Sequence, residues 1–262
     1  KDFAAKSLPQ TIDVEVPTVM RDAPVPTTIV LPGSYFDEPN RKYPVLYMLH
    51  GATGDNRQYV QMTENIIKLA DFYNVLVVCP DGGYTSWYFD SPVDPSYQYE
   101  TFVTKELVAY VDSSYRTHQS SERRATAGIS MGGHGALFLA MRHPDVFGTA
   151  VSMSGGVDIR PFPGRWDIAQ RIGSMEEHPE RWEELTVVNQ AKEHLRRDTK
   201  LAISLGCGVT DFFIHVNRNL HNQLMEMNIP HDYMEYPGGH HWDFWKRVLP
   251  FYFSFVNENI NS

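Results

Sequence analysis

The sequence has few cysteines and no long hydrophobic run. Its two cysteines, Cys79 and Cys207, are too few for a disulfide framework, and neither lies in a metal-binding spacing such as C-x-x-C. The histidines form no H-x-x-x-H or H-x-H pattern, so we expect neither a metal nor a cofactor. No apolar run approaches the roughly 18 residues that a transmembrane helix needs.

Positive charge is also scarce. The chain carries 23 Lys and Arg against 32 Asp and Glu, a formal net charge of −9. Such a surface repels phosphate groups, which argues against nucleic acid or a membrane as a partner. The chain opens at Lys1 without a methionine, so the sequence leaves open both export after removal of a leader and a cytoplasmic location. It does not indicate the oligomeric state.

The chain alternates short strand-like runs with helical patterns. The predicted strands are residues 11–17, 25–31, 44–50, 75–80, 124–128, 149–153, 201–205 and 232–236, and the predicted helices are residues 63–73, 102–115, 135–141, 212–227 and 242–256. The first two strands read as an antiparallel pair, whereas continuous apolar runs such as 44–50 are typical of buried parallel strands. We therefore expect one α/β domain over residues 1–262, with a mostly parallel eight-stranded sheet flanked by helices.

The stretch from 155 to 195 is too long for a plain crossover helix. We interpret it as a cap inserted after the sixth strand, over the carboxyl edge of the sheet. Its aromatic residues, and those of a second aromatic stretch after the fourth strand, are candidates for contact with a substrate, with packing as the alternative. These candidates are Trp87, Tyr88, Phe162, Trp166 and Trp182.

The most informative motif is Gly128-Ile-Ser130-Met-Gly132-Gly133. It places a G-x-S-x-G pattern between a predicted strand and a predicted helix, which is the context of a nucleophile elbow. The sharp turn of an elbow presses neighbouring backbone together, so the positions that flank the serine must be nearly without side chains. We predict that Ser130 is a nucleophile.

A serine hydroxyl needs a base, and the base needs a group that orients it. In folds with this elbow the acid and then the histidine follow later strands. Asp211 follows the strand at 201–205, and its alternative role as a helix cap is compatible with the first. After the last strand come His240 and His241; the two glycines before His240 favour it as the base, and His241 is the alternative.

Acyl transfer also needs two backbone N–H groups that stabilise an oxyanion. Met131 supplies one at the start of the helix after the elbow. The second comes from the loop after 44–50, where Ala52 is the candidate and Gly51 the alternative. Gly51 is also a candidate for contact with the substrate. His50, at the start of this loop, is interpreted as a structural brace.

These motifs resemble the putative esterase (esterase D-like) family of α/β hydrolases, which includes feruloyl esterases, tributyrin-type esterases, S-formylglutathione hydrolases and mycobacterial mycolyltransferases. The similar segments lie within residues 43–247 and include YMLHGATGD, PDGGYTSWY, AGISMGGHGALFLAMRHPDVFG and PGGHHWDFW. The resemblance implies the α/β-hydrolase fold and Asp211 as the acid. The family pattern G-x-H-x-W-x-x-W places the catalytic histidine at His240, and the resemblance also supports Ala52 and Met131 as oxyanion donors.

Together these features predict a serine carboxylesterase for a small-molecule or polysaccharide-linked ester, with acetyl or feruloyl-type acyl groups on plant polysaccharide as the expected substrate. The alternative is an S-formylglutathione hydrolase, although that group usually carries a D-H-S-Y-like segment where this chain has GGHHW. An acyltransferase that uses long acyl chains is disfavoured, because residues 155–195 do not resemble the cap of a mycolyltransferase. A non-catalytic binding protein is disfavoured because no triad residue is missing.

Overall fold

Eight strands form one sheet within residues 4–261, the part of the chain that this computed structural model describes. Their order across the sheet is β1-β2-β4-β3-β5-β6-β7-β8. The strands are β1 (Gln10–Val16), β2 (Val25–Leu31), β3 (Val45–Leu49), β4 (Leu76–Pro80), β5 (Arg124–Ile129), β6 (Thr149–Met153), β7 (Ala202–Gly208) and β8 (Asp232–Tyr236). Each overlaps one of the predicted strands, which confirms the whole predicted set.

The sheet is mostly parallel. Only β1 with β2 and β2 with β4 pair antiparallel, whereas every pairing among β3 to β8 is parallel. The carboxyl ends of parallel strands meet at one edge of a sheet. The segments that follow β3, β5, β7 and β8 therefore lie at the same edge, although they are far apart in the sequence. This arrangement confirms the predicted fold class.

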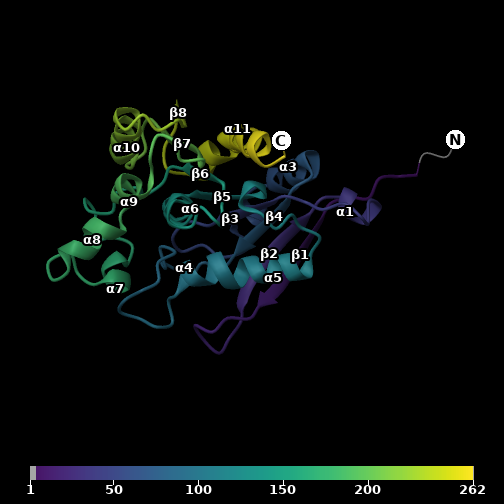
Figure 1. Cartoon of the computed structure of the whole chain (residues 1–262), viewed down its shortest axis with the longest axis horizontal. Helices are drawn as coiled ribbons and strands as arrows, with labels where there is room; N and C mark the ends of the chain where they lie inside the picture. Colours follow the sequence, from purple (N-terminus) through teal and green to yellow (C-terminus); the bar gives the residue numbers. More distant parts are fainter. Residues whose placement is uncertain (1–3, 262) are drawn as a thin grey trace.

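Helices cover both faces of the sheet. They are α1 (Ser34–Asp37), α2 (Gln58–Met62), α3 (Asn65–Tyr73), α4 (Tyr99–Thr101), the π-helical turn η1 (Phe102–Leu107), α5 (Val108–Ser114), the 3₁₀ turn η2 (Ser121–Arg123), α6 (Met131–Arg142), α7 (Ile168–Ile172), α8 (Pro179–Leu185), α9 (Val187–His194), α10 (Ile214–Glu226) and α11 (Trp242–Ile260). Figure 1 shows α3 and α11 on one face of the sheet and α5 on the other. Within residues 4–261, no helix is both long and apolar enough to cross a membrane.

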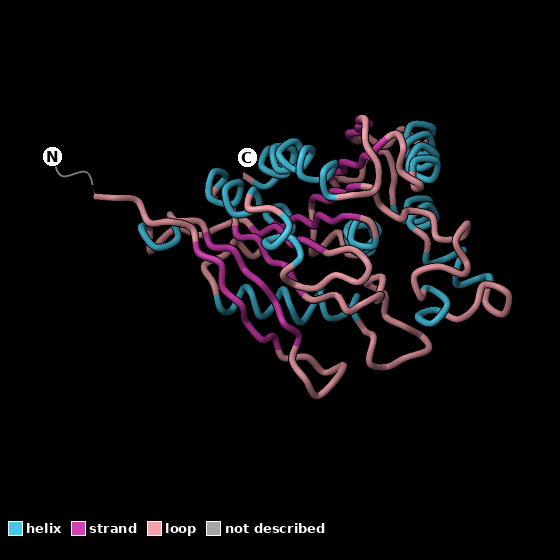
Figure 2. The backbone as a smooth tube through the Cα atoms, turned by 180° about the vertical axis from the view of Figure 1, so that it is seen from behind, coloured by secondary structure: helices cyan, strands magenta, loops and turns pink. Residues whose placement is uncertain are grey.

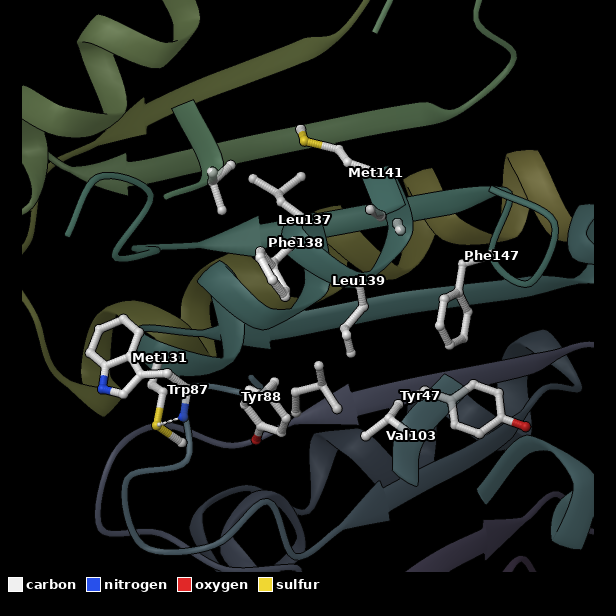
Figure 3. Packing of buried hydrophobic residues seen from close by; sticks show 14 of the residues in the cluster. Tyr47, Trp87, Tyr88, Val103, Met131, Leu137, Phe138, Leu139, Met141 and Phe147 are labelled. Atoms are coloured by element: carbon white, nitrogen blue, oxygen red, sulfur yellow. Dashed lines mark hydrogen bonds between the residues drawn. The ribbon is translucent and has the colours of Figure 1, made fainter. Parts of the chain in front are cut away.

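The alternation of side chains along β3 explains why helices pack on both faces of the sheet. Leu46 and Met48 are buried in a cluster with α3 and α11, whereas Tyr47 and Leu49 are buried in a second cluster with α5 and α6. Successive side chains of a strand point to opposite faces. A strand without polar residues, as β3 is, therefore needs a helical layer on each side. Figure 3 shows part of the second cluster, with residues of α6 at its centre.

Residues 155–195 connect β6 to β7 and contain the three short helices α7, α8 and α9. Of these, α9 packs against α6. The views in Figure 1 and Figure 2 place α7 and α8 at the end of the molecule opposite β1 and β2. The interpretation of this segment as a cap stays a prediction.

The strand order separates the two cysteines. Cys79 lies in β4 and Cys207 in β7, with β3, β5 and β6 between them. Four inter-strand steps of about 4.8 Å amount to roughly 19 Å, whereas a disulfide needs Cα atoms within about 7 Å. Both thiols are free and buried, and burial raises the pKa of Cys79 to about 12.

We expect the denatured, unreduced protein to titrate with two thiols per chain in a reaction with a chromogenic disulfide reagent. The native protein should react slowly, because both thiols are buried. The Cys79→Ser variant serves as a control and should titrate with one thiol. An unreduced protein that shows no thiols, with a mass lower by two hydrogens, would contradict the strand order.

Candidate functional site

Ser130 lies in the tight turn between β5 and α6. Its backbone has φ 56° and ψ −117°, a conformation that a residue with a side chain adopts only where its surroundings hold it. The turn leaves no room for a side chain at Gly128 or at Gly132. A Cβ at Gly128 would lie 2.2 Å from the carbonyl oxygen of Gly132, and a Cβ at Gly132 would lie 1.9 Å from that of Leu49. These two glycines let α6 begin directly against the ends of β5 and β3.

Three predicted residues from distant parts of the chain meet beside this turn. The Nε2 atom of His240 lies 2.9 Å from the Oγ atom of Ser130. The Nδ1 atom of the same ring lies 2.8 Å from an Oδ atom of Asp211. With its proton on Nδ1, the imidazole donates to the carboxylate while Nε2 accepts the serine hydroxyl proton. The Asp211 side chain has no solvent exposure, and that of His240 is 16% exposed.

The loop after β7 holds the Asp211 carboxylate in place. Its second oxygen accepts the backbone N–H of Phe213 at 2.8 Å, one residue before α10 begins. The same loop is joined to the loop of His240, because the backbone N–H of Thr210 donates to the carbonyl oxygen of Gly238 at 3.0 Å. Asp211 thus orients His240 and also satisfies an amide next to a helix start, although the N-cap position itself belongs to Phe213.

Of the two adjacent histidines, only His240 reaches the serine. His241 has an extended backbone and is the residue before α11. Among residues 4–261, no hydrogen bond joins its ring to Ser130 or Asp211. Only the His240 imidazole is therefore hydrogen-bonded to Ser130 and to Asp211.

The loop after β3 offers one free amide at the site. The N–H of Gly51 donates to the side chain of Gln58 at 3.2 Å, and the N–H of Thr53 donates to the carbonyl oxygen of Tyr84 at 2.6 Å. Within the described part of the chain, the N–H of Ala52 between them has no acceptor. The N–H of Met131 is likewise available, because the first residue of a helix has no intrahelical acceptor. The N–H of Ala52, rather than that of Gly51, is therefore the one in this loop that remains available to a ligand.

His50 is a brace for that loop and not a second base. Its side chain is only 1% exposed. The backbone N–H of Gly82 donates to its Nε2 atom at 2.8 Å, so Nε2 carries no proton. Its Nδ1–H donates to the carbonyl oxygen of Gly51 at 2.7 Å. Both ring nitrogens are therefore occupied, and they tie the loop after β3 to the loop after β4.

A cavity of about 260 Å³ opens beside Ser130. Its walls come from the loops after β3 and β5, from residues 155–195, from the loop of Asp211 and from the start of α11. The lining residues are Gly51, Ala52, Thr53, Gln58, Ile129, Ser130, Trp166, Phe212, His240, Trp242 and Trp245. Much of this surface is aromatic, so the space next to the serine suits an apolar group with a polar reacting centre.

Three aromatic residues that we expected at the substrate do not reach the cavity. Trp87, Tyr88 and Trp182 are each at most 1% exposed. The Tyr88 hydroxyl donates to the carbonyl oxygen of His50, and the Trp182 indole N–H donates to that of Gly173. Figure 3 shows Trp87 and Tyr88 packed in the core beside α6. These three predictions are wrong, because the polar atom of each ring has an internal acceptor that draws the whole side chain inward.

The two other aromatic candidates differ. Trp166 lines the cavity. Phe162 is half-buried and does not line it, but packs edge-on against Phe213 with ring centroids 5.2 Å apart. Phe162 therefore supports the loop of Asp211, where we had expected it to contact the substrate directly.

The sequence-based prediction missed aromatic residues around the histidine. The ring centroid of Phe212 lies 4.3 Å from that of His240, and the Trp245 ring meets His240 edge-on at 4.9 Å. Trp245 is fixed in turn, because its indole N–H donates to the Oγ atom of Ser154 at 3.0 Å. Both residues could have been found from the sequence. Trp245 is part of the G-x-H-x-W-x-x-W pattern, and Phe212 directly follows the predicted acid.

Comparisons with known proteins found a matching family model, relatives and solved structures of similar fold. A family model described as "Putative esterase" matches residues 19–253. An acetyl esterase of Caldicellulosiruptor saccharolyticus is 28% identical over 241 residues, which cover 85% of this chain and 90% of that protein. A ferulic acid esterase structure has a TM-score of 0.83 at 24% identity, covering 97% of this chain and 99% of the other. An S-formylglutathione hydrolase of Staphylococcus aureus has a TM-score of 0.81 at 19% identity, covering 96% and 100%. At these identities the two structures share the fold.

The adjacent histidines provide a matched pair of variants. His240→Ala should lower kcat on p-nitrophenyl acetate by on the order of 10⁴-fold or more, because residues of a nucleophile–base–acid set act as a unit. His241→Ala should retain most of the turnover, because its ring makes no hydrogen bond to Ser130 or Asp211 within residues 4–261. Steady-state kinetics of both variants, with melting temperatures as a check on folding, decides the point. Equal losses in the two variants would refute the assignment of the base.

Proposed function

This chain belongs to the putative esterase family and is a carboxylic-ester hydrolase, and we propose that Ser130, His240 and Asp211 are its catalytic triad. The observation that carries the proposal is the pair of hydrogen bonds of His240, at 2.9 Å to Ser130 and 2.8 Å to Asp211. We further propose that residues 1–262 act as one catalytic domain, with residues 155–195 as its cap.

In this proposal the Oγ atom of Ser130 attacks the ester carbonyl carbon while its proton passes to Nε2 of His240. The buried Asp211 carboxylate stabilises the imidazolium that forms. The negative charge on the carbonyl oxygen is stabilised by the N–H groups of Ala52 and Met131. His240 then gives its proton to the alcohol that leaves. Water, deprotonated by His240, releases the acid from the acyl-enzyme.

We propose that the acyl group is of modest size, either acetyl or feruloyl-type, and is attached to plant polysaccharide. The cavity volume of about 260 Å³ lies near the lower end of the usual range for ligand sites, which suits a short or flat acyl group. The aromatic walls suit a feruloyl ring. The likeness to proteins named acetyl esterase and ferulic acid esterase supports the same two groups.

Replacement of the nucleophile tests the mechanism. Ser130→Ala should reduce ester turnover to near background, because no other group then forms the acyl-enzyme, while the melting temperature changes little. A fluorophosphonate probe should add one label per chain of the parent protein, and peptide mass spectrometry should place it on Ser130. Labelling of a different residue, or full turnover by the variant, would contradict the proposal.

A substrate panel tests the acyl group. We expect kcat/KM on methyl ferulate or acetylated xylan to exceed that on S-formylglutathione, because the segment around His240 lacks the D-H-S-Y-like sequence typical of the thioester hydrolases. p-Nitrophenyl esters of increasing chain length should show declining kcat/KM as the acyl chain exceeds the cavity. Ser130→Ala serves as the blank. Turnover of S-formylglutathione far above that of both oxygen esters would favour the thioester alternative.

A further inference from the structure

Trp166 reaches the cavity from a backbone segment in an unusual conformation. Trp166 and Asp167 have φ values of 50° and 58°, and in the loop after β4 Trp87 and Tyr88 have φ values of 55° and 56°. Two consecutive left-handed residues with side chains are disfavoured, and such strain persists only where neighbouring contacts hold it. The two strained segments touch each other, because the Trp87 indole N–H donates to the carbonyl oxygen of Trp166 at 3.0 Å.

A buried polar cluster joins the same two segments. The Thr85 hydroxyl donates to an Oδ atom of Asp167 at 2.8 Å. The Arg171 guanidinium donates to the Thr85 carbonyl oxygen at 2.9 Å and to the Thr85 hydroxyl oxygen at 3.1 Å. Thr85 is 2% exposed and Arg171 is 8% exposed. The hydroxyl group of Thr85 thus links the buried Arg171 cation to the partly exposed Asp167 carboxylate, and a buried cation needs such polar partners.

Further contacts fix each side of this cluster. The Arg171 guanidinium lies over the Tyr97 ring, 3.7 Å from its centroid. On the other side, the Nε2 atom of His134 in α6 lies 2.9 Å from the carbonyl oxygen of Trp87. His134 is fully buried, and burial lowers its pKa to about 3, so the ring is neutral and donates to Trp87. Trp87 also contacts the sulfur of Met131, as the dashed line in Figure 3 shows.

Trp166 connects the cluster of Thr85, Asp167 and Arg171 to the cavity beside Ser130. Its ring stacks on Phe212, with centroids 5.7 Å apart and an interplanar angle of 22°. Phe212 in turn lies against His240. Trp166 and Phe212 both line the cavity beside Ser130. The position of the Trp166 ring therefore determines how much room a bulky acyl group has.

We propose that Thr85, Asp167 and Arg171 are positioning residues that hold Trp166 as a fixed wall of the ester cavity and so determine which acyl groups are accepted. The inference rests on the proposed esterase function. An acetyl group fills little of the cavity that Trp166 lines, whereas a feruloyl ring is large enough to pack against the Trp166 ring in this proposal. Loss of the cluster should therefore weaken the use of large aromatic acyl groups and leave acetyl esters unaffected.

The test compares p-nitrophenyl ferulate with p-nitrophenyl acetate, which share a leaving group and differ in the acyl part. Thr85→Val removes the hydroxyl at constant shape, and Thr85→Ser retains it. We expect Thr85→Val to lower kcat/KM on the ferulate by about 10-fold, mainly through KM, a size typical of altered pocket contacts. Its kcat/KM on the acetate should stay within about 2-fold of the parent. Thr85→Ser should behave as the parent protein.

A double variant separates a role in positioning from a merely structural one. In a Trp166→Ala background, Thr85→Val should cause no further change in the ferulate-to-acetate ratio, because coupled residues are not additive. If Thr85→Val does not fold, Asp167→Ala takes its place, with Asp167→Asn as the conservative control that keeps the acceptor oxygen. The fluorophosphonate labelling rate of each variant reports whether Ser130 and His240 remain intact.

Equal losses on both esters, or the same shift of the ratio with and without Trp166, would overturn the inference. A Thr85→Ser variant as defective as Thr85→Val would do so too. If the parent protein hydrolysed neither ester, the proposed function would fail, and the inference with it. Turnover of both esters with an unchanged ratio in Thr85→Val would overturn only the inference.

Discussion

The first turn of α6 lies against the ends of β3 and β5, with no room for side chains between them. This close approach depends on Gly128 and Gly132, whose Cβ atoms would overlap with neighbouring carbonyl groups. It brings the Ser130 hydroxyl above the edge of the sheet and sets the Met131 amide beside the loop after β3. The proposed nucleophile and the two proposed oxyanion amides come together because the backbones of these three elements touch. A bulkier residue at either glycine would force them apart.

The second requirement is a carboxylate that is held in place away from water. Asp211 meets it with two hydrogen bonds, one to His240 and one to the amide of Phe213. Burying an ion without such partners is costly. The loops after β7 and β8 are also hydrogen-bonded to each other through Thr210 and Gly238. The two loops thus hold Asp211 and His240 within hydrogen-bonding distance of each other, which is the preorganisation that the proposed mechanism requires.

Around this polar centre the site is aromatic, and its walls come from separate segments. Phe212 follows the acid, Trp245 belongs to α11, and Trp166 belongs to the stretch between β6 and β7. The α/β sheet supplies the reacting groups on short, rigid turns, whereas Trp166 stands on a longer segment held by contacts with the loop after β4. In the proposed function, the reacting groups and the residue proposed to select the acyl group therefore have different structural supports.

The sequence by itself determined the strands, their mostly parallel arrangement and the elbow, because hydrophobic periodicity and the steric needs of a tight turn are local properties. It also identified Ser130, Asp211 and His240 as candidates, since their order along the chain follows from the order of the strands. Only the tertiary structure decided which aromatic residues face the cavity. Trp87 and Trp182 are as aromatic as Trp166, but both are buried, and their indole N–H groups donate to backbone carbonyl oxygens inside the protein. The tertiary structure also decided which amide of the loop after β3 is available to a ligand. It is that of Ala52, because the amides of Gly51 and Thr53 donate to Gln58 and Tyr84. Of these contacts, those of Trp87 with Trp166 and of Thr53 with Tyr84 join residues far apart in the chain, so no local pattern encodes them.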